Sequence, residues 1–297
     1  MMAYTAAING RTPEKPRTRH SQNTLGWLFD MYERSAKFAG LSDGTRKMYS
    51  GEIKRIVKKS GGVRLSDITE KTIRLARERR SNQPGAANMF LKVMKSAFKW
   101  GIESGLIDEN PARHVSAVSV KTDGFAPWTE EDLAAYETRH PLGTMARLAL
   151  DIYLCTSFRR SDGHLLGHQH LKNGMIRYRT KKEGVLVELP LLPRLKQSIE
   201  ATETGDMTFL ITSRGKPFSS PESLSGWFRK RCDEAGVSKS LHGIRKFNAE
   251  VVAESGASEQ EMMALFGWLS PTMPTRYAKR ANRAKMASRS IRFLDRK

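Results

Sequence analysis

Apolar residues recur at the spacing of an α-helix along most of this chain, and this periodicity restricts the fold more than any other feature. The first stripe covers residues 25–36 and is expected to end at Gly40. Further helices are predicted from Ser42, which can cap one, through residues 68–75 and over residues 84–102. Four helices within about 90 residues predict a small all-α domain. Its apolar faces are expected to include Tyr32, Ala36, Met48, Ile53, Ile56, Ile73, Leu75, Val93 and Phe98.

The second half of the chain combines helical patterns with one short stretch of alternation. Thr129 and Asp132 are spaced as a capping box that opens a helix, and a long apolar helix is predicted around residues 145–154. Apolar and polar residues then alternate over residues 175–180 and 185–189, on either side of a glycine-containing turn. We therefore predict a mainly α chain with a small antiparallel β-sheet.

Composition shifts divide the chain into four parts. Residues 1–20 are rich in Arg, Lys, Pro and Thr and are expected to be a flexible basic arm. Residues 21–112 form the predicted helical domain, and residues 113–127 lack periodicity and are interpreted as a linker. Residues 128–297 form a mixed, mainly helical second domain.

The charge balance points to a polyanionic partner. The chain has 51 Lys and Arg against 31 Asp and Glu, a formal net charge of +20. Such an excess repels other copies of the chain unless a polyanion neutralises it, and nucleic acid is the leading candidate. A solvated basic surface without a partner is the alternative. An anionic membrane is disfavoured because basic residues occur throughout the chain instead of on one amphipathic helix.

The cysteines, the apolar runs and the histidines bear on the compartment of the protein and on metal binding. The 2 cysteines form neither a disulfide framework nor a zinc pattern, and no signal peptide or membrane-length apolar run is evident. A soluble protein in the cytoplasm, associated with the nucleoid, is expected. His164 and His168 could share a helix face and bind zinc, but no glutamate lies between them as a zinc-protease motif requires. No metal and no cofactor are therefore predicted.

Five segments of the second half resemble the motifs of the tyrosine recombinases, the phage-type integrases. Residues 156–162, TSFRRSD, resemble the T-G-L-R-x-S-E box, and residues 180–184, TKKEG, resemble the lysine-bearing hairpin. Residues 241–245, 265–268 and 275–277, which read LHGIR, LFGW and TRY, resemble the H-x-L-R, L-G-H/W and tyrosine motifs. The match is strong over the C-terminal domain and weak over the N-terminal domain, where it rests on size and position.

The resemblance implies a fold and a set of catalytic residues. The fold would be an N-terminal four-helix core-binding (SAM-like) domain and a mixed α+β catalytic recombinase domain ending in a helix exchanged between subunits. Tyr277 would be the nucleophile, and Arg159 and Arg245 would clamp the phosphate that it attacks. No metal is needed in this scheme because planar guanidinium groups absorb the charge of the transition state. ATP is not needed because the bond energy is kept in a 3′-phosphotyrosyl link.

Three further residues take roles from the same resemblance. His242 would be the general acid or base, since imidazole titrates near neutrality. Lys181 would protonate the departing 5′-oxygen, although the adjacent Lys182 is not excluded. Trp268 stands where most members have His, and it can position groups and donate a hydrogen bond but cannot transfer a proton. Tyr153 and Tyr178, the rival tyrosines, are expected to be packing residues.

The implied function is site-specific recombination, in the integration or excision of a phage or other mobile element. The implied partners are double-stranded DNA recombination sites, held by a homotetramer, with accessory DNA-bending or directionality factors as further candidates. A basic DNA-binding protein without catalysis and a relaxing enzyme like the type IB topoisomerases are the alternatives.

Two local features leave questions open. Ser157, Phe158 and Gly243 depart from the family's usual residues without touching the reacting groups. After Tyr277, a thin apolar stripe of Ala284, Ala287, Ile291 and Leu294 predicts a terminal helix. That helix could pack on its own domain or on a neighbouring subunit.

Overall fold

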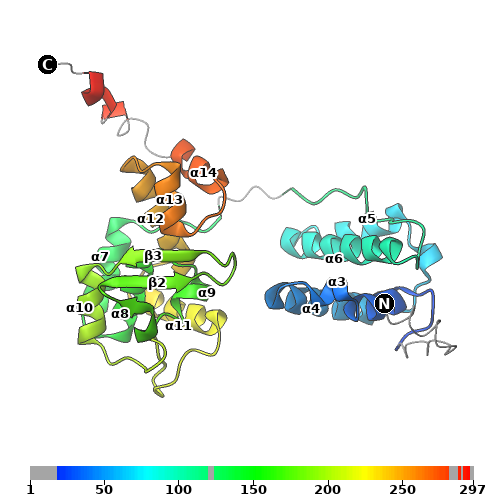
Figure 1. The fold of residues 1–297 in the computed structure, drawn as a ribbon. Coiled ribbons are helices and arrows are strands. Elements are labelled where there is room, and N and C mark those ends of the chain that lie inside the picture. The colour runs from blue at the N-terminus through cyan, green and yellow to red at the C-terminus, as the bar shows by residue number, and fades with distance from the viewer. Residues whose placement is uncertain (1–18, 120–123, 281–286, 289, 295–297) are drawn as a thin grey trace, which may run out of the picture. The chain divides into compact units, whose positions relative to one another are not determined.

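The computed structural model describes residues 19–119, 124–280, 287–288 and 290–294. It divides into two compact units, Met1–Thr122 and Asp123–Lys297. The prediction of a mainly helical chain with a small antiparallel sheet is confirmed (Figure 1). Across the described residues, no helix combines the length and the apolar character needed to cross a membrane.

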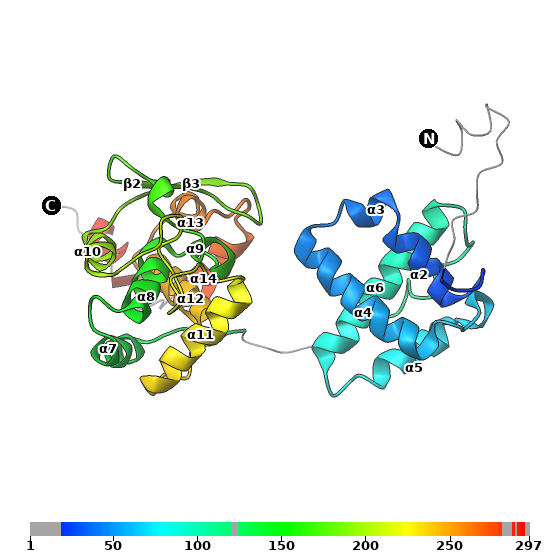
Figure 2. The same ribbon diagram turned by 90° about the horizontal axis from the view of Figure 1, so that it is seen from below.

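The first unit is helical, and its elements are α2 (Leu25–Glu33), α3 (Ala36–Ala39), α4 (Asp43–Ser60), η1 (Leu65–Asp67), α5 (Glu70–Glu78) and α6 (Pro84–Glu103). Helices α2 and α4 both contact α6, as does α5 (Figure 2). The side chain of Thr24 caps α2 and that of Ser42 caps α4, while a proline begins α6.

The prediction of one continuous helix from residue 25 to Gly40 is wrong. The chain breaks after α2, and Ser35 caps the separate short helix α3 by accepting a hydrogen bond from the backbone N of Phe38 at 3.1 Å. Phe38 is buried there, whereas Ala36 is exposed. A serine that caps a new turn overrides the apolar spacing, because its hydroxyl satisfies a backbone donor that the continuous helix would have paired.

Two residues predicted for the core are exposed instead. Met48 and Leu75 are 53% and 50% exposed. Successive residues turn by about 100° around a helix, so Leu75 lies roughly opposite the buried Ile73, and Met48 lies well off the side of Ile53. Each of these two helices therefore buries a narrower apolar face than the sequence pattern predicted.

The second unit places a small sheet and a group of helices around α8. The sheet order is β1-β2-β3, with all neighbours antiparallel, and Tyr178 pairs with Val187 in the β2–β3 register. The helices are α7 (Glu130–Arg139), α8 (Met145–Thr156), α9 (Arg160–Gly163), η2 (His168–His170), α10 (Pro193–Ala201), α11 (Pro221–Glu234), α12 (Leu241–Glu254), α13 (Glu259–Phe266), α14 (Thr272–Arg280) and η3 (Ile291–Leu294). The strands are β1 (Leu171–Lys172), β2 (Met175–Arg179) and β3 (Leu186–Pro190).

The predicted hairpin is present, with one strand more than expected. Strands β2 and β3 flank a turn in which Gly184 adopts φ +67°, and the two-residue β1 adds to the outer side of β2. On the other side, β3 contacts α13, and helices α12, α13 and α14 gather at this end of the unit (Figure 1). The turn of the hairpin, the first residues of α12 and the middle of α14 belong to the segments that carry the family motifs.

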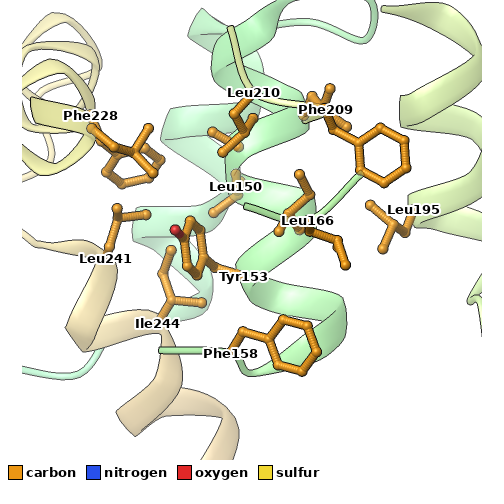
Figure 3. Packing of buried hydrophobic residues seen from close by; sticks show 14 of the residues in the cluster. Leu150, Tyr153, Phe158, Leu166, Leu195, Phe209, Leu210, Phe228, Leu241 and Ile244 are labelled. Atoms are coloured by element: carbon orange, nitrogen blue, oxygen red, sulfur yellow. The ribbon is translucent and has the colours of Figure 1, made fainter. Parts of the chain in front are cut away.

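One apolar core supports this arrangement. Figure 3 shows Leu150 and Tyr153 of α8 meeting Leu241 and Ile244 of α12, with Phe158 next to them. The Tyr153 hydroxyl donates to the carbonyl of Arg160 at 3.2 Å and so holds the backbone of α9. The core thus fixes α8, α9 and α12 relative to each other.

Both ends of the predicted linker make contacts, each with its own unit. Val115 is buried in the first unit, and Val118 exchanges two hydrogen bonds with the side chain of Asn88, at 2.8 and 3.0 Å. In the second unit, Phe125 packs on His242 with ring centroids 4.8 Å apart, and Trp128, which directly follows the predicted linker, is buried and donates to the carbonyl of Ser240 at 2.9 Å. The apolar stripe predicted after Tyr277 is described only in part: Ile291 and Leu294 are 60% and 72% exposed, and Ala284 lies outside the described residues.

Candidate active site

The turn after α8 positions Arg159. Ser157 ends α8 with φ 55°, in the left-handed conformation that favours glycine. The Asn248 side chain of α12 donates to the Ser157 hydroxyl at 2.7 Å and to the carbonyl of Leu154 at 2.8 Å. Arg159 then follows as the residue that opens α9. The usual glycine of this motif is thus replaced by a serine whose conformation is held by a partner on another helix.

Arg245 is the most enclosed cation of the site. It lies one turn into α12, is 7% exposed, and donates through Nη1 to the carbonyl of Ser157 and through Nη2 to that of Phe266 at 2.8 Å. Burial, followed by the nearby charge of Arg159, lowers the pKa of Arg245 to about 9. The guanidinium therefore stays charged at pH 7 and has a fixed position between two backbone carbonyls.

Asp162 links the hairpin to the segment that follows α8 and carries Arg159. Its carboxylate is 1% exposed and accepts a hydrogen bond from the backbone N of Lys181 at 2.9 Å. Burial raises the pKa of Asp162, while the bond from Lys181 and the charges of Arg159 and Arg245 oppose that rise. This contact fixes the backbone of Lys181, whose side chain is exposed, as is that of Lys182. The catalytic role of Lys181, with Lys182 as the alternative, stays a prediction.

His242 lies in the first turn of α12 under an aromatic cover. The Ser240 side chain caps this helix, and the ring of Phe125 packs on the imidazole with centroids 4.8 Å apart. Desolvation of the covered part of the ring, followed by the charges of Arg245 and Arg160, lowers the pKa of His242 although the residue is exposed. The imidazole is therefore neutral at pH 7 and able to accept a proton.

Trp268 stands between two other aromatic rings. Helix α13 ends at Gly267 in the left-handed conformation, and Trp268 stacks on Phe266 with centroids 4.5 Å apart. On its other side it stacks on Tyr277 of α14, with centroids 5.8 Å apart and planes 7° from parallel. Tyr277 is 9% exposed and lies close enough to Arg245 to influence the pKa of that arginine. Tyr277 thus lies in a packed environment, which its basic sequence neighbours did not indicate.

The structure therefore gathers the six predicted residues around one centre. The charge of Arg245 interacts with Arg159 and Tyr277, its guanidinium lies 5.5 Å from the Trp268 ring, and it also acts on His242. Lys181 joins the group through Asp162. Their catalytic roles stay predictions.

The other candidate nucleophiles and the candidate metal-binding histidines have other partners. Tyr153 and Tyr178 are buried, and burial raises the pKa of Tyr178 to about 12, which disfavours ionisation of its phenol. His168 contacts the hydroxyl of Thr204, and the ring of His170 accepts from the backbone N of Gly167. Among the described residues, no cluster of three or more His, Cys, Asp or Glu side chains could hold a metal.

Three contributors were not singled out from the sequence: Glu183, Asn248 and Phe125. Glu183 follows the two lysines of the hairpin and accepts hydrogen bonds from Arg159 Nη2 at 2.9 and 2.8 Å. Asn248 lies three residues after Arg245, so helical spacing places both on one side of α12 and could have indicated it. The pairing of Phe125 with His242 and of Glu183 with Arg159 depends on tertiary structure, and no local pattern signals it.

Comparison with known proteins gives consistent matches. Residues 129–283 match the model of the phage integrase family. The integrase of Enterobacteria phage 434 is 25% identical over 289 residues, covering 92% of this chain and 78% of the relative. A lambda integrase dimer bound to a COC′ core site is similar with a TM-score of 0.74 and 23% identity, over 84% of this chain and 97% of that one. A lambda integrase tetramer bound to a Holliday junction is similar with a TM-score of 0.74 and 22% identity, over 91% and 87%.

Proposed function

The chain belongs to the phage integrase family of tyrosine recombinases, and from this premise we propose that it breaks and rejoins DNA at specific sites through a covalent bond to Tyr277. The observation that carries the proposal is the position of Arg245, which lies 5.5 Å from the Trp268 ring that stacks on Tyr277 and donates to the carbonyl of Ser157, two residues before Arg159. Two guanidinium groups next to a phenol suit one reaction well, the displacement of an alkoxide from a phosphodiester.

In the proposed reaction, the Tyr277 oxygen attacks the scissile phosphorus. A phenol has a pKa of about 10 in water, so it is neutral at pH 7 and must lose its proton as the bond forms. Nearby cations favour this loss because they stabilise the phenolate. The P–O bond to the 5′-oxygen breaks, giving a 3′-phosphotyrosyl link and a free 5′-hydroxyl. Attack by a 5′-hydroxyl of a second strand reverses these steps, so the bond energy is conserved and no ATP is consumed.

Each surrounding group has a part in this scheme. Arg159 and Arg245 bind the non-bridging oxygens, whose charge grows in the transition state, and they replace a metal ion in this role. His242, neutral at pH 7 by its lowered pKa, accepts a proton from the phenol. Lys181 protonates the departing 5′-oxygen. Trp268 acts by position alone, holding the Tyr277 ring from one side.

The proposed partners follow from the charge and from the similar structures. A net charge of +20 suits a DNA duplex. The similarity to a lambda integrase tetramer on a Holliday junction supports a homotetramer that holds two duplexes. We place the reaction in the integration or excision of a mobile element, with accessory DNA-bending or directionality factors as candidate partners.

The test uses a pooled library of nicked suicide duplexes, in which cleavage traps the enzyme on its DNA. The wild-type chain is expected to give an adduct that survives denaturation, and sequencing of the captured DNA identifies the site. Tyr277→Phe should abolish the adduct and keep DNA binding in a gel-shift assay, whereas the matched control Tyr178→Phe should keep both. An adduct that persists in Tyr277→Phe would remove this residue from its role.

The same preparation separates the alternatives. DNA binding without any adduct in the wild-type chain would indicate a non-catalytic basic protein. Relaxation of supercoiled plasmids irrespective of sequence would indicate an enzyme like the type IB topoisomerases.

A further inference from the structure

A carboxylate from the hairpin lies at the arginine that we assign to the phosphate. Glu183 accepts from Arg159 Nη2 through both of its oxygens, at 2.9 and 2.8 Å. The two side chains are only 17% and 22% exposed. The charge of Glu183 also acts on the pKa of Arg245, so this carboxylate influences both arginines of the site.

The contact leaves Arg159 with further hydrogen-bonding capacity. Its Nη1 atom is buried and has no hydrogen-bond partner within the described part of the chain. A phosphate offers more acceptor oxygens than a carboxylate, and a guanidinium fork binds two of them at once. Because Nη2 is shared between the two Glu183 oxygens, a phosphate would have to take this donor from Glu183 to use the fork fully.

The turn of the hairpin holds Glu183 within reach of Arg159. Between the ends of β2 and β3, residues 180–185 close on themselves through backbone bonds of Thr180 with Gly184 and Val185, at 2.9 and 2.8 Å. Asp162 anchors the start of this loop at Lys181, two residues before Glu183. Release of Glu183 from Arg159 would therefore require rotation of its own side chain, with the backbone of Lys181 held in place by Asp162.

We propose that Glu183 is an internal stand-in for the scissile phosphate, which occupies Arg159 until a DNA phosphate displaces it. The carboxylate keeps a desolvated cation paired and keeps the guanidinium in its working position. Its cost is competition, because every phosphate that binds must first replace it. The reading of the site rests on the proposed function, but the competition for Arg159 can be measured without catalysis.

Two matched substitutions test this competition. Glu183→Gln keeps the size of the side chain and removes its charge. Glu188→Gln makes the same change on β3 of the same hairpin, where Glu188 pairs with Arg177 at 2.6 Å and both side chains are about half exposed. Both variants change the net charge equally, so general attraction to anions changes equally. Glu183→Ala is a second variant if the glutamine retains too much of the contact.

The first measurement is the affinity for inorganic phosphate. Binding is monitored by the NMR signal of the Arg159 side chain, which is assigned by its loss in Arg159→Lys. Glu183→Gln should bind phosphate about tenfold more tightly than the wild type, equivalent to about 1.4 kcal/mol. Glu188→Gln should match the wild type. Equal affinities in all three proteins would overturn the proposal.

The second measurement is the rate of adduct formation on the suicide duplex. Glu183→Gln should form the adduct faster than Glu188→Gln at low DNA concentration. A slower adduct in Glu183→Gln would instead mean that Glu183 only positions Arg159, which overturns the stand-in role. If no protein forms an adduct but Glu183→Gln still binds phosphate tenfold more tightly, the proposed function fails and the stand-in role is supported.

Discussion

The two sides of the candidate site hold their cations by different means. On the α12 side, Arg245 is buried and donates to two backbone carbonyls, which cannot leave without unfolding the turn after α8 or the end of α13. On the hairpin side, Arg159 is held by the side chain of Glu183. One side is fixed by the fold, and the other is closed by a group that can exchange. A site built in this way keeps its geometry while leaving room for an anion to enter.

The largest effect is expected from the fixed side. Arg245→Lys keeps a positive charge, but an ammonium group lacks the planar fork that reaches the carbonyls of Ser157 and Phe266. Loss of one such donor set should slow adduct formation by about 10²–10³-fold. The rate on a suicide duplex is the measurement, with Arg177→Lys on the outer hairpin as control. A loss below fivefold would show that α12 does not supply the fixed half of the clamp.

A smaller effect is expected at Asn248, which stabilises the end of α8 and the turn that follows it. Its amide donates to the carbonyls of Tyr153 and Leu154, at 3.2 and 2.8 Å, and to the Ser157 hydroxyl. Asn248→Ala should lower the free energy of unfolding by about 1–3 kcal/mol, because buried acceptors lose their donor. Urea denaturation measures this. The companion Ser157→Gly loses one hydroxyl but relieves the left-handed conformation, so its change should be smaller; a larger one would contradict this account.

The smallest expected effect concerns the cover on His242. The pKa of His242 in the folded chain lies below the ordinary value of 6.5. As the pH falls through 6.5, the unfolded chain takes up this proton first, so the folded state loses stability until its own lower pKa is reached. Phe125→Ala removes part of the desolvation and should move the pKa of His242 back toward 6.5. An NMR titration of the imidazole reads this directly, and an unchanged or lower pKa would assign the shift to the arginines alone.

Local patterns were sufficient to predict the start of α7, the hairpin and α8. The capping box of Thr129, the alternation on both sides of Gly184 and the apolar face of α8 each depend on residues close in sequence. The motif residues lie in the hairpin turn, before α9, on α12, after α13 and on α14, and their order and type indicated the candidate site. The break at Ser35 was missed because one hydrogen bond at a cap decided it against an otherwise helical spacing.

The contacts that set the properties of the site were beyond local reasoning. Arg159 and Glu183 are 24 residues apart, and Asn248 is 91 residues from Ser157. Which carboxylate meets a given arginine depends on where the hairpin folds against α9. The stack of Tyr277 on Trp268 likewise depends on the packing of α14 beside α13, and basic neighbours in the sequence concealed it.

Gly243 has a consequence for chimeric proteins. A Cβ atom at this position would come within 2.5 Å of the carbonyl oxygen of Ala126 and 3.0 Å of the Trp128 ring. A relative with a larger side chain at this position must therefore route residues 124–128 differently. The start of α12 and that crossing segment form one transplantable block, and exchanging either alone between relatives would misplace the histidine and the arginine that share its first turns.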